Sequence, residues 1–245
     1  MTSTTERVAI VTGGSGGIGR ASALRLADDG FAVVVHYHGH PERAEATVAS
    51  ILESGGRAIA VGGDLADEAA ATALFDATER ELGGVDVLVH TAGIMPLSPI
   101  AELDLDVFDT IQRVNVRSTF VVDKLAAQRV RPGGAIINFS TSITRLQTPT
   151  YGAYAASKAA VEAIGLILAR ELRGRDVTVN TIAPGPTGTP LFLDGKSPEL
   201  VEQIARSNPF ERLGTPQDVA ETVAFLAGPA RWVNGQTLFV NGGAA

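Results

Sequence analysis

A tyrosine and a lysine stand four residues apart, at Tyr154 and Lys158. On a helix this spacing puts both side chains on one face. A free phenol has a pKa of about 10, which is too high for an efficient base near neutral pH. An ammonium group about 5 Å away, at an effective dielectric constant of about 20, favours the phenolate by roughly 3 kcal/mol. The pKa would fall by roughly two units. The pair predicts a tyrosine that exchanges a proton with a carbonyl or an alcohol; an incidental pair on a surface helix is the alternative.

Three hydroxyl side chains, Ser140, Thr141 and Ser142, precede this pair and follow an apolar run. A hydroxyl at the end of a strand could hold a substrate carbonyl oxygen beside Tyr154. An ordinary Ser/Thr turn or a helix cap would use the same residue types. The cluster therefore adds Thr141 and Ser142 to the candidate catalytic residues.

A glycine-rich turn, Thr12–Gly19, lies between the apolar run Val8–Val11 and a helical segment that starts near Arg20. The free N–H groups of a helix N-terminus attract anions, and glycines let the backbone approach a pyrophosphate closely. A flexible surface loop is the alternative, because one glycine motif is weak evidence. The candidate cofactor-binding residues in this turn are Gly13, Ser15, Gly17, Ile18 and Gly19.

Short apolar runs alternate with helical stretches along the chain and predict the elements that position these residues. The predicted strands are Val8–Val11, Ala32–Tyr37, Ala58–Val61, Val85–His90, Ala135–Phe139, Val177–Ile182 and Thr237–Val240. Glycines typical of helix C-caps mark the ends of the helices between these strands, at Gly30, Gly55-Gly56, Gly83-Gly84 and Gly174. Pro41 suits the first turn of the second helix. Strands without polar alternation are buried on both faces. The pattern predicts one α/β domain over residues 1–245, with a doubly wound, Rossmann-like parallel sheet and helices on both faces.

In such a sheet, ligands bind beyond the carboxyl ends of the strands. The segments at those ends are Thr12–Gly19, Tyr37, Asp64, His90–Gly93, Ser140–Ser142 and Pro184–Thr189. A proline-rich region over residues 184–215 is predicted to be irregular and to form a mobile flap over the site.

Composition limits the partners. The chain of 245 residues has a net charge of −7, scattered Lys and Arg residues and no cysteine. These features argue against nucleic-acid binding, disulfides, thiolate catalysis and Cys-based zinc sites. Residues Met1–Arg7 contain no apolar signal region, and no stretch is apolar for the roughly 18 residues that a membrane span needs. We expect a cytoplasmic protein that binds neither nucleic acid nor membrane.

Several motifs occur together in one order and spacing. They are Gly13-x-x-x-Gly17-x-Gly19, Asn115, the hydroxyl cluster, Tyr154-x-x-x-Lys158, and Pro184-Gly185 followed by Thr189. The chain thereby resembles the short-chain dehydrogenase/reductase family over nearly its whole length. The resemblance implies that Tyr154 is the general acid–base and that Lys158 binds the nicotinamide ribose and lowers the tyrosine pKa. It also implies that Asn115 holds a water that links the lysine to solvent. Counting back from the tyrosine assigns the family's serine to Thr141, with Ser142 one position away.

The resemblance also assigns cofactor contacts. Asp64, followed by Leu65, matches a position that binds the adenine amino group, although Asp is equally ordinary as a helix N-cap. Ile182 and Thr189, which flank the Pro184-Gly185 turn, match contacts to the nicotinamide carboxamide. The family's Asn-Asn-Ala-Gly segment is His90-Thr91-Ala92-Gly93 here. Ala92 and Gly93 keep the close backbone approach, whereas the loss of both asparagines puts the usual hydrogen bonds in doubt.

The second strand indicates the cofactor. Tyr37 stands where a carboxylate would favour NAD, so nothing there repels a 2′-phosphate. His38, His40 and Arg43 are possible partners of that phosphate. We predict NADP(H), with NAD(H) possible, although Gly16 occupies a position that is often basic in phosphate-preferring relatives. His36, His38 and His40 alternate, but no carboxylate or cysteine set completes a metal site.

A small or medium, largely apolar ketone, aldehyde or secondary alcohol is the expected substrate. The predicted pocket residues are Ile94, Met95, Leu97, Arg145, Leu146, Tyr151, Pro186, Leu191 and Phe192. A 3-oxoacyl thioester and a sugar or polyol are the alternative substrates. A non-catalytic dinucleotide-sensing protein is the alternative from another class; such proteins typically lose the tyrosine or the lysine. Alanines around Tyr154 would allow close helix–helix packing, and members of the family are usually tetramers, so we expect a homotetramer. Trp232 is expected near an interface or in the core.

Overall fold

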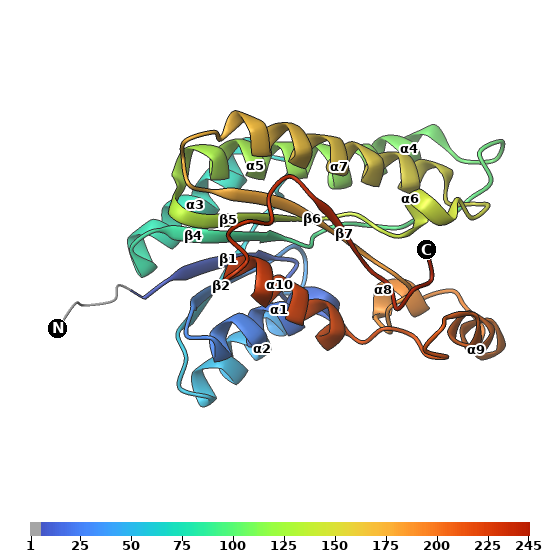
Figure 1. Cartoon of the computed structure of the whole chain (residues 1–245), viewed down its shortest axis with the longest axis horizontal. Coiled ribbons are helices and arrows are strands. Elements are labelled where there is room, and N and C mark those ends of the chain that lie inside the picture. The colour runs from blue at the N-terminus through green and yellow to red at the C-terminus, as the bar shows by residue number, and fades with distance from the viewer. Residues whose placement is uncertain (1–5) are drawn as a thin grey trace.

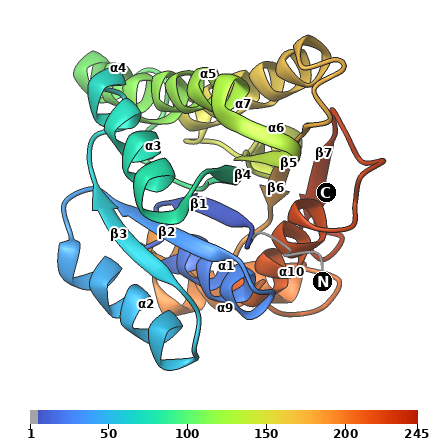
Figure 2. The same cartoon turned by 90° about the vertical axis from the view of Figure 1, so that its left-hand side faces the viewer.

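The computed structural model describes residues 6–245, and within them the strands form one sheet. The strands are β1 (Val8–Thr12), β2 (Ala32–Tyr37), β3 (Ala58–Gly62), β4 (Val85–His90), β5 (Val130–Phe139), β6 (Thr178–Pro184) and β7 (Thr237–Val240). Their order is β3-β2-β1-β4-β5-β6-β7, and every neighbouring pair is parallel. Figure 2 shows β3 at one edge and β7 at the other. The predicted doubly wound parallel sheet is confirmed.

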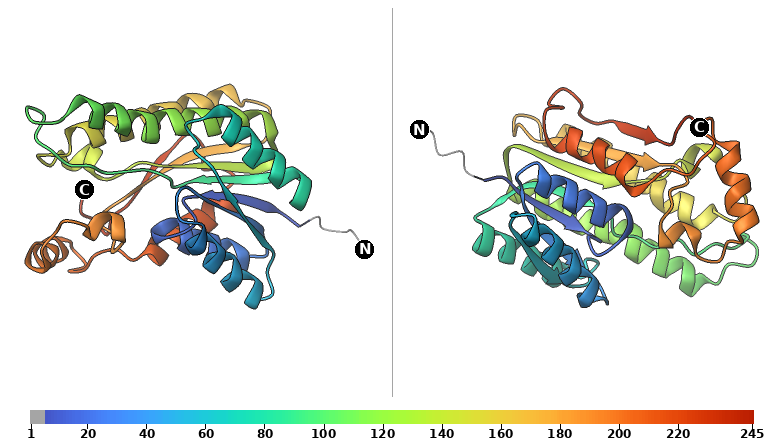
Figure 3. Two further views of the ribbon diagram at one scale, coloured as in Figure 1. Left: turned by 180° about the vertical axis from the view of Figure 1, so that it is seen from behind. Right: turned by 90° about the horizontal axis from the view of Figure 1, so that it is seen from below.

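Helices cover both faces of the sheet (Figure 1). On one face lie α1 (Gly17–Asp28), α2 (Pro41–Glu53) and α10 (Pro216–Ala227), which Figure 3 shows from below. On the other lie α3 (Glu68–Leu82), α4 (Leu105–Ile111), α5 (Ser118–Arg129) and α7 (Gly152–Glu171). A π-helical segment, η1 (Gln112–Arg117), joins α4 to α5. Three short helices lie toward the carboxyl ends of the strands: α6 (Ile143–Leu146), α8 (Pro190–Leu193) and α9 (Pro198–Ser207).

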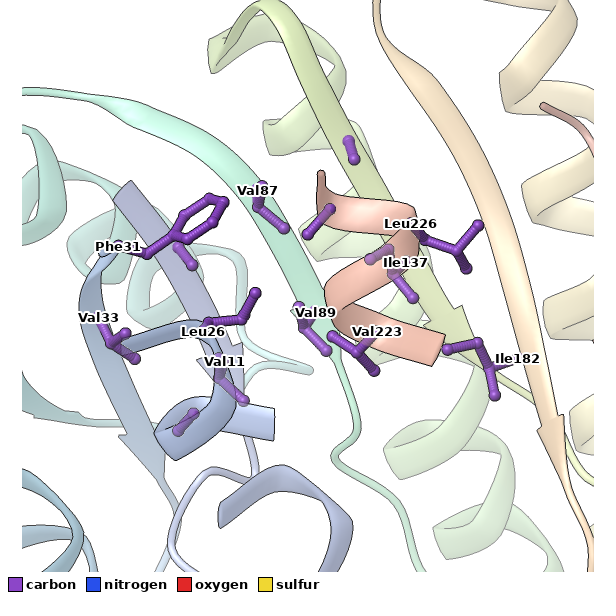
Figure 4. Packing of buried hydrophobic residues seen from close by; sticks show 14 of the residues in the cluster. Val11, Leu26, Phe31, Val33, Val87, Val89, Ile137, Ile182, Val223 and Leu226 are labelled. Carbon is purple, nitrogen blue, oxygen red and sulfur yellow. The ribbon is translucent and has the colours of Figure 1, made fainter. Parts of the chain in front are cut away.

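The face that packs against α1 and α10 is apolar up to the carboxyl ends of the strands. Successive side chains of a strand point to opposite faces, so each strand contributes alternate residues to this cluster (Figure 4). The cluster includes Val11, Leu26, Phe31, Val33, Val87, Val89, Ile137, Ile182, Val223 and Leu226. We call it the apolar face.

The opposite face changes character before the strands end. Its apolar residues Ile10, Val34, Leu88, Ile136 and Val179 are each followed, two positions later, by a buried polar residue. These polar residues are Thr12, His36, His90, Asn138 and Thr181, and we call them the polar row. The sheet register aligns them, because Thr12 pairs with His90, His90 with Asn138, and Asn138 with Thr181.

Local signals set most of the element ends. Gly30, Gly55, Gly83 and Gly174 have left-handed φ values where C-caps were expected, and Pro41 begins α2. Several strand ends differ from the prediction by one or two residues, and two boundaries differ by more. The first helix begins at Gly17 rather than near Arg20. β5 begins at Val130 rather than Ala135, because Val130 pairs with Val85 across a register shift.

Region 184–215 is more ordered than the sequence predicts. It contains α8 and α9, and a proline occupies the first turn of each helix, where its missing N–H is tolerated. The side chains of Thr189 and Ser197 cap the two N-termini. The prolines therefore begin helices here, and the mobility of this flap stays a prediction.

One helix is long and apolar enough to span a membrane when judged by length and composition alone, contrary to the expectation from the sequence. Helix α7 has 20 residues and a mean hydropathy of 1.3 over its most apolar window. The same composition is typical of a core helix, and α7 packs on the sheet with Tyr154 and Lys158 buried. The proposed absence of a signal region concerns residues that lie mostly outside those described.

Candidate active site

Helix α7 places Tyr154 and Lys158 on its buried face, as their spacing predicts. Tyr154 is 7% exposed and Lys158 is 5% exposed. The ammonium group of Lys158 lies 5.9 Å from the centre of the Tyr154 ring and donates a hydrogen bond to the Phe139 carbonyl, at 2.9 Å. The carboxyl end of β5 therefore holds the lysine beneath the tyrosine.

The predicted pKa of Tyr154 is wrong for this structure. Burial raises the pKa of the phenol to about 12, and a hydrogen bond with Thr141 acts in the opposite direction. Burial also lowers the pKa of Lys158 to about 8. The sequence argument assumed that charge attraction between the pair dominates, but here desolvation outweighs it. Tyr154 is consequently protonated at neutral pH, which suits a group that donates a proton to a carbonyl oxygen.

The hydroxyl cluster resolves into separate contacts. Thr141 is the member whose hydroxyl acts on the Tyr154 phenol, where it lowers the pKa of that group. Ser142 instead donates to the Ala183 carbonyl at 3.2 Å and accepts from the Asn241 amide at 3.1 Å. The Ser142 hydroxyl is thus committed to the β6 and β7 ends, and the geometry favours Thr141.

Neighbouring Ser140 and Thr144 both donate to the carboxylate of Glu162. Glu162 lies one turn beyond Lys158 on α7. It fastens both ends of the segment that carries Thr141, a role that the sequence did not indicate.

Asn115 lies in the π-helical segment and is completely buried. Its side-chain oxygen accepts from the Ile94 N–H at 2.9 Å, and its amide donates to the Ile94 carbonyl at 2.9 Å. The same amide donates to Ser157, at 3.0 Å, and Ser157 donates to the Tyr154 carbonyl at 2.7 Å. Asn115 therefore fixes the segment after β4 against the catalytic helix. The relayed water that the resemblance implies stays a prediction.

The glycine turn has the geometry of a phosphate cradle. Gly13 and Gly17 have φ values of +64° and +51°, which side chains rarely adopt. A Cβ at Gly19 would lie 2.2 Å from the Gly13 carbonyl, so no larger residue fits. The first turn of α1 has no side-chain cap and no acidic residue, which leaves its N–H groups for an anion. Ser15 and Ile18 lie in the same turn.

The segments expected at the nicotinamide end converge on this cradle. A Cβ on Gly17 would touch Thr189, at 3.4 Å, so the turn after Pro184-Gly185 reaches across to the glycine turn. A Cβ on Gly93 would lie 3.1 Å from the Asn115 side chain and 3.3 Å from the Lys158 ammonium group. Ala92 and Gly93 thus present bare backbone beside the lysine. These residues fit a dinucleotide that extends from the cradle to Tyr154.

The adenosine end differs in detail from expectation. The ring of Tyr37 folds against Gly62 at the end of β3. Asp64 accepts from the Ala66 N–H at 3.0 Å and pairs with Arg113 at 2.6 Å. Although burial acts to raise it, the pKa of Asp64 is lowered by these contacts. Arg113 lies in the π-helical segment, and no motif in the sequence indicates that it pairs with Asp64.

Leu65 is buried in the core, so its side chain is not free to contact a cofactor. The three alternating histidines also separate. His36 is buried, and burial lowers its pKa to about 4, whereas His38 and His40 are exposed. Solvated loop histidines, the alternative to phosphate contact at these three positions, therefore do not include His36. Across residues 6–245, no group of three His, Cys, Asp or Glu side chains could hold a metal ion.

A pocket of about 460 Å³ opens beside the catalytic helix. It is lined by Ile100, Ile143, Thr144, Gln147, Thr148, Pro149, Thr150, Tyr151, Gly152, Ala155, Ala156 and Ala159. Of the predicted pocket residues only Tyr151 lines it; Met95, Leu146, Pro186, Leu191 and Phe192 do not. Arg145 turns away and stacks on Phe239, at 3.6 Å. Which residues contact the substrate stays a prediction.

Comparisons with known proteins agree with this geometry. A family model described as enoyl-(acyl carrier protein) reductase matches residues 13–245. The chain is 45% identical over 249 residues to a short-chain type dehydrogenase/reductase of Picea abies, covering 97% of this chain and 92% of that protein. It is 45% identical over 252 residues to an NADPH-dependent aldehyde reductase-like protein, chloroplastic, of Arabidopsis thaliana, covering 97% and 93%. A short chain dehydrogenase from Burkholderia cenocepacia, solved in complex with NADP, superposes with a TM-score of 0.91 at 40% identity, covering 98% of each chain.

Proposed function

The chain belongs to the short-chain dehydrogenase/reductase family, and from that premise we propose that it uses NADPH to reduce a small, largely apolar aldehyde or ketone to an alcohol. The observation that carries the proposal is the meeting of Tyr154, Thr141 and Lys158 at the carboxyl end of β5, beside the glycine cradle. The preference for NADP(H) rests on Tyr37 and on two relatives, one named NADPH-dependent and one solved with NADP.

The chain's own residues divide the work. Thr141 holds the substrate oxygen, and Tyr154 donates its phenolic proton to that oxygen. Lys158 holds the ribose of the cofactor and supplies positive charge beneath the phenol. When bound, the cofactor supplies the hydride that adds to the carbonyl carbon. Because burial holds the pKa of Tyr154 above its usual value, the phenol carries at neutral pH the proton that reduction of a carbonyl requires.

The test of the proposed function is NADPH consumption with matched substrate panels. Apolar aldehydes and ketones should be reduced. Two other substrate classes test the alternatives: a 3-oxoacyl thioester, assayed for reduction with NADPH, and polyols, assayed for oxidation with NADP. Faster turnover of the thioester would move the assignment to 3-oxoacyl reduction. NADPH binding without turnover of any substrate would support a dinucleotide sensor.

Two sets of variants test the assigned roles. Thr141→Ala should lower kcat by about 10- to 100-fold, Thr141→Ser should restore most of it, and Ser142→Ala should have the smaller effect. Tyr37→Asp should shift preference toward NADH, because a carboxylate repels the 2′-phosphate. An unchanged ratio of NADPH to NADH use would contradict the placement of the adenosine end.

We also propose that the protein assembles as a homotetramer. Several large apolar side chains are exposed: Phe120, Leu166, Ile167, Phe225 and, at 100% exposure, Trp232. Trp232 therefore does not pack in the core of the chain, and its exposure supports a place at an interface between subunits. Light scattering of the purified protein gives the mass that tests this assembly.

A further inference from the structure

His90 stands where the family's asparagine is expected, and it makes two hydrogen bonds from opposite sides of its ring. Nδ1 lies 2.8 Å from the Thr12 hydroxyl, and Nε2 lies 3.2 Å from the Ser118 hydroxyl. The side chain is 2% exposed, and burial lowers its pKa to about 3. The ring is therefore neutral near pH 7 and carries a single N–H.

The neighbouring contacts fix which nitrogen carries that hydrogen. Ser118 donates its own hydroxyl hydrogen to the Val114 carbonyl, so it can only accept from His90. Nε2 must then be the N–H, and Nδ1 must be the acceptor. Thr12 accepts from the Ala92 N–H, at 3.2 Å, and donates to Nδ1.

The result is one continuous chain of hydrogen bonds. It runs from the Ala92 N–H through Thr12, His90 and Ser118 to the Val114 carbonyl. Val114 directly precedes Asn115 in the π-helical segment, and Asn115 holds both polar groups of the Ile94 backbone. The segment 92–94 is thus held on one side through Thr12 and on the other through Asn115, and His90 connects the two anchors.

The held segment is short of space. A Cβ added at Gly93 would lie 3.1 Å from the Asn115 side chain and 3.3 Å from the Lys158 ammonium group, so the backbone at this position passes close to both side chains. We propose that His90 is a positioning residue that sets the distance between the two anchors, and thereby holds the 92–94 backbone where the dinucleotide meets Lys158. This inference rests on the proposed placement of the cofactor.

Side chains of different length separate the two hydrogen bonds of His90. An asparagine places its terminal atoms near the Nδ1 position, so His90→Asn keeps the bond to Thr12 and loses Ser118. A glutamine reaches the Nε2 position, so His90→Gln keeps the bond to Ser118 and loses Thr12. Each variant should weaken NADPH binding by roughly 3- to 30-fold, the range expected for a residue that couples two anchors.

Ser118→Ala removes the other end of the chain and should weaken binding similarly. The double variant His90→Asn/Ser118→Ala should bind no more weakly than the weaker-binding single variant, because both break the same connection. Thr78→Val is the matched control: it removes a buried hydroxyl that bonds the Leu74 carbonyl at 2.8 Å in α3, away from the chain of bonds. It should lower Tm without changing the Kd of NADPH.

Two results would overturn the inference. One is a fall in Tm of the His90 and Ser118 variants with wild-type Kd for NADPH. The other comes from nitrogen-15 NMR of the unmodified protein near pH 7, which needs no variant to fold: a hydrogen on Nδ1 instead of Nε2 breaks the proposed chain. Failure of the wild-type protein to bind NADPH would instead count against the proposed function, and the NMR result would still decide the bonds of His90.

Discussion

The two faces of the same strands differ most where the strands end. On the apolar face, Val11, Val89, Ile137 and Ile182 continue a hydrophobic cluster with α1 and α10. On the opposite face the polar row replaces apolar packing. Because alternate residues of one strand serve both faces, a single sheet supplies stability on one side and supports chemistry on the other.

On the polar side, burial shifts the pKa values of four groups toward their uncharged forms. Burial shifts the pKa of His90 to about 3, of His36 to about 4, of Asp123 to about 7 and of Lys158 to about 8. Every shift favours the neutral species, as desolvation requires. The polar side is therefore expected to lower the free energy of unfolding, and the apolar face to raise it. Substitutions on the two sides should accordingly have opposite effects on stability and on activity.

The largest effect is expected at Tyr154. Tyr154→Phe removes the proton donor and keeps the ring, so kcat should fall by roughly 10²- to 10⁴-fold. The Kd of NADPH should stay near its wild-type value. Steady-state kinetics with an accepted carbonyl, together with a binding titration, measure both quantities; lost binding with unchanged kcat would contradict the assigned role.

The apolar face should show the reverse pattern. Leu226→Ala removes a fully buried side chain from α10 and should lower the free energy of unfolding by about 2–5 kcal/mol. Denaturant titration measures this loss, and the Kd of NADPH should not change. Unchanged stability together with weaker NADPH binding would contradict the assignment of stability to the apolar face.

Lys158→Met should separate stability from activity. The folded pKa of about 8 lies below the usual lysine value of 10.5, so the buried charge costs stability below pH 8, and the cost disappears as pH rises toward 10.5. The methionine should raise the free energy of unfolding at pH 7 by up to about 3 kcal/mol. Activity should be nearly lost. Equal stability of the two proteins at pH 7 would show that Lys158 carries no such cost.

Wild-type reduction should also fall above about pH 8, as Lys158 loses its charge while Tyr154 keeps its proton. A pH–rate profile at saturating NADPH measures this limb. A rate that stays level to pH 10 would remove the need for a charged lysine.

The smallest effect on activity is expected at Asp123, which accepts from the Asn138 amide at 2.7 Å beneath the polar row. Its folded pKa of about 7 exceeds the usual value of 3.8, so its contribution to stability is complete below pH 3.8 and is lost as pH rises to 7. Asp123→Asn should remove a slope of about 1.4 kcal/mol per pH unit in that window. Denaturant titrations between pH 4 and 7 compare the slopes; identical slopes would assign the carboxyl an ordinary pKa.

Local patterns predicted much of this molecule. Apolar runs gave the strands, glycines such as Gly83 gave helix ends, and the four-residue spacing placed Tyr154 and Lys158 on one face. These signals depend on residues close together in the chain. The direction of the Tyr154 pKa shift was missed because burial depends on how α7 packs against β5.

Other parts of the site depend on long-range contacts. The hydrogen bonds lost with the family's asparagines are replaced by contacts of His90 with Thr12 and Ser118, from a distant strand and helix. Arg113 and Glu162 likewise reach the site from elements whose packing the sequence does not specify. The residues that contact the substrate stay a prediction, because the paths of the loops around α6 and α8 decide which side chains face the site.

The most direct measurement is a crystal structure with NADP and an alcohol that the protein oxidises. The account predicts that the alcohol oxygen lies within hydrogen-bond distance of both the Tyr154 and the Thr141 hydroxyls, with its carbon facing the nicotinamide. An alcohol bound with its oxygen away from Tyr154, while its carbon still faces the nicotinamide, would contradict the account.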